Sequence, residues 1–387
     1  MRTRKQKIIR ILIGVGIFLV LLILLFFAFR NTILDKAIDK IATKMETDYD
    51  SKFSVKEATF QGLTGVSMKE ITLVPKGQDT LFSIQKMETS VSFWHIVVGK
   101  VQLGTLHVEN GFVQLVKKGN VKNFGAFLKR DTLSTNTSEK RDYAELAYNL
   151  ISKGLNLIPT DMNVKNLAFR LDDNGKKANI KFNELRLADK QLETSIRVQT
   201  NTFTQRWKIK GFADPRNKKA DIAFTNIDTG AIKLPYFDER FNLKSSFDSI
   251  RVNVENIDMS GDELHIDGFS SIRNLKVNHA KIAKKDVVIK DARFDYRLLL
   301  GEDFVSVDSS STVQLNKIKF NPFLEFNTEE DTIYKMKVVI PQMKAQDFIS
   351  SLPEGLFTNF EGMEAEGNFD FNLSFIFNKN KPNDLVF

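Results

Sequence analysis

The stretch that decides the fold is GNFDFNLSFIF, residues 367–377, in which every second side chain is large and apolar. Successive side chains of a β-strand point to opposite faces of a sheet, so this spacing gathers the apolar ones on one face. The other face carries Asp370, Asn372, Ser374 and Ile376. We therefore predict a strand with one dry face and one largely wet face. The side chains on the dry face are Phe369, Phe371, Leu373, Phe375 and Phe377.

Similar alternation recurs through most of the chain after residue 52. Asn110-Gly111 predicts a hairpin turn between strands 101–108 and 112–116, and Asp172–Gly175 predicts another between 164–171 and 178–182. Strands do not alternate with long helices, so we expect a mainly antiparallel sheet and not a parallel α/β fold. The other predicted strands are 66–75, 81–93, 185–187, 194–199, 204–212, 220–224, 249–254, 264–269, 275–277, 287–289, 292–300, 304–307, 313–320, 333–340 and 367–377.

A weak internal repeat accompanies these strands. Its pattern is two polar residues, an aliphatic residue, any residue and an apolar residue, and we interpret it as a repeated strand unit. The segments that carry it are Lys69–Leu73, Gly104–Val108, Lys165–Phe169, Asn183–Leu187, Arg273–Val277 and Asn316–Phe320.

The amino terminus predicts a membrane anchor. Residues 11–29 carry no charge, and extension back to Ile8 gives a segment long enough to cross the hydrocarbon core as a helix. Five basic residues lie within the first ten positions and Arg30 follows the apolar segment, which favours a cytoplasmic amino terminus and a body on the far side of the membrane. The alternative is a cleaved signal peptide, which has a shorter apolar run and a small-residue cleavage site.

Two amphipathic helices are expected besides the anchor. Residues 31–52 continue from it with apolar side chains at three- and four-residue spacing. This helix either closes one end of the β structure, which we favour, or lies on the membrane surface. The polar stretch 117–142 reads as a linker, and Tyr143–Ile158 forms the second helix before Pro159. The expected organisation is 1–30 basic stub and anchor, 31–52 helix, 53–116 first β unit, 117–160 linker and helix, and 161–387 continuing sheet.

Composition excludes several classes of protein. The 387 residues contain no Cys, which removes disulfide frameworks, zinc ribbons and Cys nucleophiles. The formal charge is +8, but residues 1–30 hold six basic residues and no acid, and the remainder is nearly neutral. We therefore expect no nucleic-acid partner. Four scattered His residues show no metal-binding spacing, and no nucleotide-binding or nucleophile motif occurs, so we nominate no catalytic, cofactor or metal residue.

Residues 1–116 resemble the start of AsmA-like proteins of the Gram-negative envelope. The resemblance rests on the amino-terminal anchor followed by the segments 58–75, 79–84, 92–106 and 108–115. It implies a periplasmic, groove-shaped β-sheet held by one inner-membrane helix, with lipid chains on its apolar face and a role in outer-membrane lipid homeostasis.

A second resemblance covers residues about 160–387, including Thr204–Pro215 and Gly362–Gly367. This region is similar to the non-catalytic amino-terminal part of membrane-anchored biosynthetic peptidoglycan transglycosylases. The catalytic Glu of that family lies in a Glu-Asp-x-x-Phe-x-x-His pattern that this sequence lacks, so no catalytic residue is carried over.

The sequence leaves three functional hypotheses. The leading one is a non-enzymatic, AsmA-like inner-membrane protein that binds or guides phospholipid acyl chains, with the five apolar side chains of residues 367–377 as lipid-facing candidates. The first alternative is the anchor and spacer of a transglycosylase whose catalytic half lies beyond Phe387. The second is an envelope scaffold that binds another protein by strand addition at a sheet edge. Alternation alone does not separate an open groove from a closed sandwich.

Overall fold

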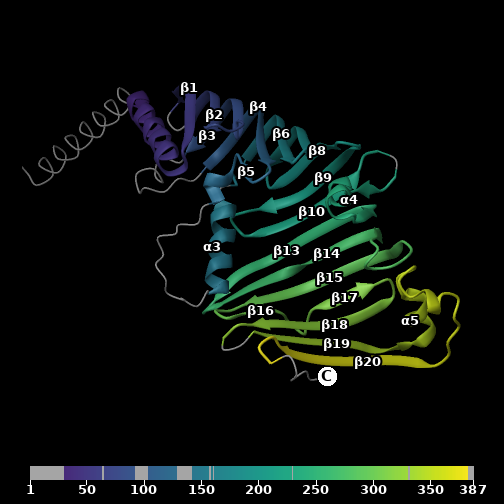
Figure 1. Cartoon of the computed structure of the whole chain (residues 1–387). Helices are drawn as coiled ribbons and strands as arrows, with labels where there is room; N and C mark the ends of the chain where they lie inside the picture. Colours follow the sequence, from purple (N-terminus) through teal and green to yellow (C-terminus); the bar gives the residue numbers. More distant parts are fainter. Residues whose placement is uncertain are drawn as a thin grey trace, which may run out of the picture.

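The protein is built on a single large β-sheet, seen in a computed structural model that describes residues 30–62, 65–91, 103–128, 142–156, 158–159, 161–228, 230–329 and 332–381. The prediction of a mainly β chain is confirmed. Figure 1 shows the sheet as a continuous twisted surface that begins at β1 and ends at β20. The strands are β1 Ser51–Gln61, β2 Gly65–Pro75, β3 Phe82–Val91, β4 Leu103–Lys118, β5 Val121–Lys122, β6 Asp161–Asp173, β7 Lys176–Ala188, β8 Gln191–Thr200, β9 Thr204–Asp214, β10 Lys219–Asn226, β11 Ile232–Lys233, β12 Lys244–Phe247, β13 Ser249–Ser260, β14 Glu263–Asn278, β15 Val287–Leu300, β16 Phe304–Val307, β17 Thr312–Leu315, β18 Ile318–Asn327, β19 Ile333–Lys344 and β20 Asn368–Asn378.

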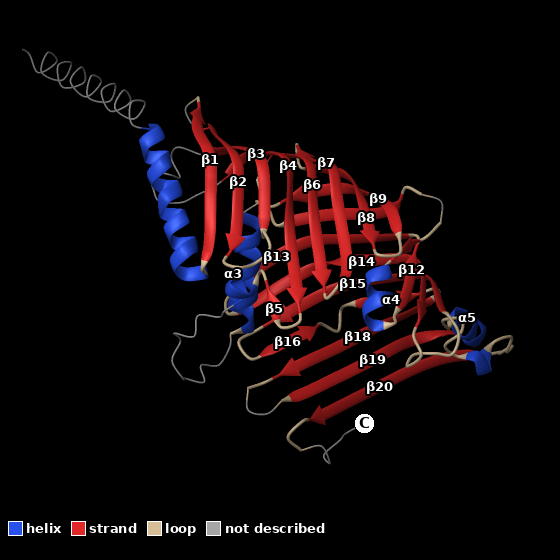
Figure 2. Cartoon of the chain, turned by 45° about the horizontal axis from the view of Figure 1, so that its top comes forward, coloured by secondary structure: helices blue, strands red, loops and turns tan. Residues whose placement is uncertain are grey.

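Hydrogen-bonded pairing follows chain order almost throughout. The sheet runs β1, β2, β3, β4, β6, β7, β8, β9, β10, β13, β14 and β15, and then β18, β19 and β20. The short strands β16 and β17 together fill the place between β15 and β18. The described residues form one sheet and no second sheet packs on it, so this is an open sheet and not a sandwich. In Figure 2 the β1–β7 part is turned relative to the strands from β13 onward, as expected from accumulated strand twist.

One pair departs from the expected antiparallel arrangement. Strands β4 and β6 run parallel, from Thr105 opposite Asp161 to Lys117 opposite Asp173. A parallel pair needs a crossover connection, and here the chain leaves β4 through β5 and the short helix η1 (Gly125–Leu128) and returns through helix α3 (Tyr143–Asn156). The polar stretch and helix predicted at 117–160 therefore form the crossover that joins the first four strands to the remainder of the sheet.

The predicted hairpin at Asn110-Gly111 is wrong. Strand β4 passes straight through this site, with Asn110 in the left-handed region at φ 54°. Its neighbours β3 and β6 pair with it on both sides of Asn110, so the residue makes a kink within a strand and not a turn. The hairpin at Asn174-Gly175 is confirmed: both residues have positive φ, and β6 pairs with β7 across them.

Aligned kinks explain why several strands appeared as two shorter runs. A first kink row crosses six neighbouring strands, and in three of them its residue is left-handed: Glu70, Asn110 and Asn166. The apolar alternation shifts by one residue at this row. In β7, Phe182 and Leu185 lie opposite Ile196 and Thr194, which share one face of the straight strand β8. The shift therefore keeps apolar side chains on one face across the kink. The row consists of Lys56, Glu70, Gln85, Asn110, Asn166 and Asn183.

A second kink row runs from the boundary of β12 and β13 through β14 and β15 to the turn between β17 and β18. The left-handed Asn274 donates from its amide to the Asp248 carboxylate, and the left-handed Asn316 accepts from the backbone N–H of Lys290 at 3.1 Å and of Asp291 at 3.2 Å. The predicted runs 264–269 and 275–277 are thus one strand, β14, and 287–289 and 292–300 are one strand, β15. The single strand predicted at 313–320 is wrong, because Asn316 and Lys317 turn the chain between β17 and β18.

Five of the six segments that carry the internal repeat contain a kink-row residue. In four of these five segments the repeat marks a position at which a strand shifts its alternation, and in the fifth Asn316 lies in the turn between β17 and β18. The exception is Gly104–Val108, which lies within β4 before its kink at Asn110.

Helices lie at the margins of the sheet (Figure 2). Residues 30–49 are helical, slightly shorter than the predicted 31–52, and lie beside the outer edge of β1. Asn31 accepts from the Phe60 backbone N–H at 3.4 Å, and the Arg30 guanidinium donates to the Gly62 carbonyl at 2.7 Å. These contacts agree with the favoured interpretation that this helix closes one end of the sheet.

Two further helices were not predicted: α4 (Pro235–Phe241) and α5 (Ala345–Ser351). Each has seven residues, too few turns to establish a helical period in the sequence. Packing holds them in place, since the Arg240 guanidinium reaches the Asp173 carboxylate at 2.7 Å and the Phe348 ring stacks on Phe369 with centroids 4.0 Å apart.

Candidate functional site

The most extended chemical feature of the sheet is an apolar face that continues from strand to strand. Cross-strand pairing places the apolar residues of each strand opposite those of the next on the same face. One row of directly opposed residues runs Val164, Leu185, Thr194, Ile209, Phe224, Ile250, Ile272, Ala292, Leu315 and Ile318. A second runs Met259, Leu264, Leu300, Val305, Phe326, Tyr334 and Phe377. We call the face that these rows define the apolar face.

The apolar face is only partly covered. Among the described residues 16 apolar side chains are buried, which is few for a chain of this length. Seven large side chains of the apolar face are exposed, although they lie in strands spread from β4 to β20. They are Leu115, Phe169, Val252, Val305, Leu324, Tyr334 and Phe371. An exposed apolar surface of this extent is typical of a binding surface.

The five nominated residues of β20 all lie on the apolar face. Phe371, Leu373, Phe375 and Phe377 lie opposite Ile340, Val338, Met336 and Tyr334 of β19. Phe369 lies beyond a bulge in β19 and stacks on Phe348 of α5. Four of the five therefore line the apolar face directly, and Phe369 is covered by a helix at its end.

Of the seven exposed residues, only Phe371 is among the lipid-facing candidates predicted from the sequence. Five of the other six, all except Leu324, fall within predicted strands, and the alternation that identified β20 applies equally to them. Leu324 lies in the part of β18 that no predicted strand covered. The sequence alone does not show which of these side chains are exposed or which share a face, because both depend on which strands are neighbours.

Tyr296 shows how the apolar face accommodates a polar atom. Its hydroxyl donates to the backbone carbonyl of Asn253 at 2.8 Å, and burial raises the pKa of the phenol. The partner strand carries Gly268 opposite Tyr296, where a Cβ would lie 2.7 Å from the hydroxyl. A half-buried phenol with a backbone partner keeps this part of the face free of an unpaired polar group.

The opposite face is polar and carries ion pairs between neighbouring strands. Arg297 meets Asp267 at 3.1 Å, Lys335 meets Glu325 at 2.8 Å, and Lys210 meets Glu193 at 2.9 Å, each across adjacent strands. The guanidinium of Arg251 donates to the Asp221 carboxylate and lowers the pKa of that acid. These exposed pairs contribute little stability individually, but they give this face a different chemical character from the apolar face.

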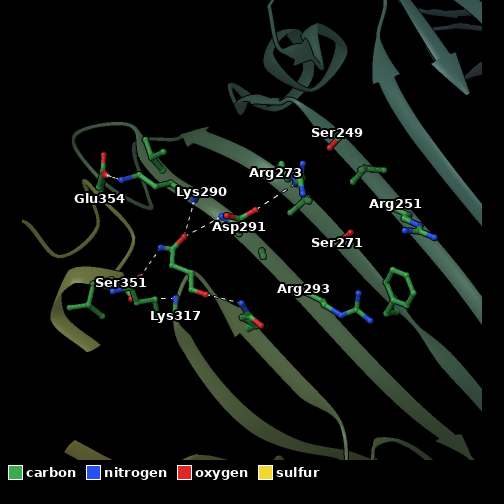
Figure 3. Close-up of a pocket in the computed structure, with 18 of the residues that line it drawn as sticks. Ser249, Arg251, Ser271, Arg273, Lys290, Asp291, Arg293, Lys317, Ser351 and Glu354 are labelled. Atoms are coloured by element: carbon green, nitrogen blue, oxygen red, sulfur yellow. Dashed lines mark hydrogen bonds and ion pairs between the residues drawn. The ribbon is translucent and has the colours of Figure 1, made fainter. Parts of the chain in front are cut away.

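A large hollow lies on this polar face of the described chain. It encloses about 870 Å³ over β10, β13–β15 and the segment after α5 (Figure 3). Its five cationic side chains each have an acidic partner within 4.0 Å: Arg251 with Asp221, Arg273 with Asp291, Lys290 with Glu354, Arg293 with Asp295 and Lys317 with Asp347. The hollow is thus internally neutralised and offers no surplus charge to a ligand.

Helix α3 lies along one rim of the sheet and leaves most of the apolar face open (Figure 1). It contacts turns between strands: the backbone N–H of Tyr143 donates to Glu302 at 3.2 Å, and Lys218 donates to the Tyr148 hydroxyl at 3.0 Å. The Lys218 ammonium lowers the pKa of that phenol. Its first turn reaches the apolar face, where the Tyr143 ring lies 6.4 Å from Phe326.

No group of side chains in the described residues has the geometry of a metal site. His107, His265 and His279 lie on different elements, and His95 lies outside the described residues. His265 has Glu263 at 3.6 Å, and His279 accepts a backbone N–H at 3.1 Å, which are ordinary local contacts.

The predicted membrane anchor, residues 8–29, lies outside the described residues. Within the part of the chain that the structure describes, no helix is both long enough and apolar enough to cross a membrane.

Comparison with known proteins gives no relative. No protein-family model, curated protein or solved structure matches this chain.

Proposed function

We propose that this protein is a non-enzymatic, AsmA-like lipid-binding protein whose apolar face holds phospholipid acyl chains. The observation that carries the proposal is the exposure of seven large apolar side chains on one face of an open sheet. Burial of an acyl chain against such a face removes both surfaces from water, at about 0.8 kcal/mol for each CH₂ group. Because the apolar face recognises hydrocarbon, binding depends on the acyl chain and not on the headgroup of the phospholipid.

The proposed location of the protein is the bacterial cell envelope. The apolar segment 8–29 anchors the chain in the inner membrane of a Gram-negative bacterium, with the amino terminus cytoplasmic and the sheet periplasmic. In this arrangement the helix at 30–49 connects the anchor to the β1 end of the sheet. The apolar face then offers acyl chains a continuous path away from the membrane, in support of envelope biogenesis.

The test compares a variant altered on the apolar face with a variant altered on the polar face. Phe371 and Ile376 of β20 are 40% and 39% exposed, but Phe371 lies on the apolar face and Ile376 on the polar one. The full chain is purified in mild detergent and offered phospholipid with a photoreactive acyl chain. We expect Phe371→Glu combined with Leu324→Glu to reduce the crosslinked lipid severalfold, and Ile376→Glu to leave it unchanged.

Mass spectrometry of the adducts then locates the acyl chain. Peptides from β4, β6, β13, β16, β18 and β19 that carry Leu115, Phe169, Val252, Val305, Leu324 or Tyr334 are the expected sites. Adducts spread equally over both faces, or equal loss in the two substituted proteins, would contradict acyl-chain binding by the apolar face.

A further inference from the structure

A second hollow of the polar face lies at the rim of the sheet where α4 packs beside β12 (Figure 2). It encloses about 550 Å³, a size typical of small-ligand sites. Three lysines from three short stretches of strand line it: Lys233 of β11, Lys244 of β12 and Lys276 of β14. We call this site the lysine hollow.

Strand register brings the three lysines together. Ser246 of β12 lies opposite Lys233 on one side and opposite Lys276 on the other. Lys244 is two residues from Ser246 along β12, so the two side chains point to the same face. Neighbouring strands are about 4.8 Å apart, which places the backbones of Lys233 and Lys276 about 10 Å apart. Side chains of this length reach over Ser246 from both sides, so the three ammonium groups surround one space.

These lysines lack the partners that the cations of the hollow in Figure 3 have. Within the described chain, none of the three ammonium groups has a hydrogen bond or an acidic oxygen within 4.0 Å, and the Ser246 hydroxyl has no hydrogen bond. Lys233 lies over the Phe203 ring, 5.7 Å from its centroid. Like charges on neighbouring strands repel one another, so an anion placed among the three lysines would remove a destabilising repulsion.

Two acids also line the lysine hollow and do not cancel its charge. Asp286 accepts from the Asn278 amide at 2.7 Å, and Asp238 lies in the first turn of α4. Three lysines against two carboxylates leave one positive charge in the hollow. Lys281 and Lys284, in the adjoining turn between β14 and β15, are exposed and have no acidic partner in the described residues, so they add to the positive field.

We propose that the lysine hollow binds the phosphate group of a phosphate ester. The three ammonium groups and the Ser246 hydroxyl donate to the phosphate oxygens, a role for which Lys is a common choice. The hollow is larger than a bare phosphate requires, and the organic part of the ester lies against its apolar wall of Phe203, Leu234 and Pro235. This chemistry is shared by a phospholipid headgroup and a soluble phosphate ester.

The site is separate from the apolar face. Lys276 lies between Leu275 and Val277 in β14 and points to the opposite, polar side of the sheet. The inference therefore does not depend on acyl-chain binding by the apolar face, and either proposal stands if the other fails.

Lysine footprinting tests the site in full-length protein in a nonionic detergent. The acetylation rate of each lysine is measured by mass spectrometry with glycerol 3-phosphate, with phosphatidylglycerol and with diacylglycerol, which has acyl chains but no phosphate. We expect a phosphate-bearing probe to slow acetylation of Lys233, Lys244 and Lys276 severalfold, and diacylglycerol to leave it unchanged. Lys290 and Lys317, which are paired with acids in the hollow of Figure 3, serve as internal controls and should not respond.

The two phosphate probes distinguish the source of the ligand. Protection by glycerol 3-phosphate indicates a soluble ester, and protection by phosphatidylglycerol alone indicates a lipid headgroup; both support the site. Absence of protection with either probe, equal protection of the control lysines, or protection by diacylglycerol would overturn the inference.

Matched variants test the same site by a second route. We expect Lys233→Gln with Lys276→Gln to abolish the protection of Lys244, because too little positive charge remains to hold the phosphate. The control, Lys290→Gln with Lys317→Gln, also removes two positive charges from the polar face and should preserve the protection. Circular dichroism verifies that each variant is folded. Equal protection of Lys244 in the two variants would contradict phosphate binding by the lysine hollow.

Discussion

At the scale of single residues, Asp214 is the carboxylate whose surroundings alter its acidity most clearly. It ends β9 with its side chain 6% exposed, its carboxylate 2.7 Å from the Lys190 ammonium and 2.7 Å from the Asn217 amide. Lys190 lies in the turn between β7 and β8, and Asn217 in the turn between β9 and β10. The ammonium, helped by the amide, holds the pKa of Asp214 at about 2. One carboxylate thereby ties two turns together at a rim of the sheet.

Stability should depend on pH through this group. A lowered folded-state pKa means that the ionised carboxylate stabilises the fold above its ordinary pKa, and this contribution is lost as pH falls toward about 2. We expect Asp214→Asn to lower the free energy of unfolding by about 1 kcal/mol at pH 7, since Lys190 is partly solvated. The difference from the unaltered protein should shrink between pH 4 and pH 2. Urea unfolding at several pH values measures it, with Asp262→Asn in an exposed turn as control; a difference that does not vary with pH would contradict the role of the charge.

At the scale of elements, the kink rows determine how a long strand keeps one apolar face. In β6, Val164 and Leu167 both belong to the apolar face although they are three residues apart, because Asn166 between them is left-handed at φ 52°. Asn tolerates this conformation better than other residues with a Cβ, and the Asn166 amide also donates to Asn110 of the same row at 3.2 Å. The kink is thus encoded by residue type and supported by its neighbour across the parallel pair.

The change in the free energy of unfolding on substitution of Asn166 should depend on how well the new residue adopts left-handed backbone, and not on its strand propensity. We expect Asn166→Gly to change the free energy of unfolding by less than about 0.5 kcal/mol, and Asn166→Val to cost about 1–2 kcal/mol even though Val is a better strand former. The adjacent Lys165→Val, at an exposed position of ordinary strand geometry, serves as control and should be nearly neutral. Urea midpoints of the three variants decide the matter; a stabilising Asn166→Val would show that the kink is dispensable.

At the scale of the whole molecule, the open sheet separates this protein from a compact domain of the same length. In the described part of the chain, twenty strands form one surface, helices lie at its margins, and few apolar side chains are buried. The first four strands connect to the others through a single parallel pair, β4 with β6. The shape therefore depends on an unbroken ladder of strand pairs and less on a central core.

This shape predicts a scattering signature. A compact domain of 387 residues has a radius of gyration of about 21 Å. We expect neutron scattering in contrast-matched detergent to give a clearly larger value for a single chain. A value near that of a compact domain would mean that the sheet closes on itself in solution.

The sequence by itself determined the local features that depend on nearest neighbours. It predicted most strands, the turn at Asn174-Gly175, the helix beginning at Tyr143 and the two-faced character of β20, because alternation and turn chemistry act within a few residues. It did not separate a turn from a kink at Asn110, because Asn and Gly favour left-handed backbone in both. That choice depends on whether neighbouring strands continue past the residue.

Only the tertiary structure decided which strands are neighbours, and with it the candidate site. The parallel junction of β4 and β6, the single open sheet and the alignment of the kinks all arise from hydrogen bonds between distant segments. Leu115 and Phe169 show what the sequence alone cannot predict. Each has the pattern of an ordinary core residue in its own strand, yet both are exposed on one face. Exposure is a property of what packs over a residue, and alternation along one strand carries no information about that.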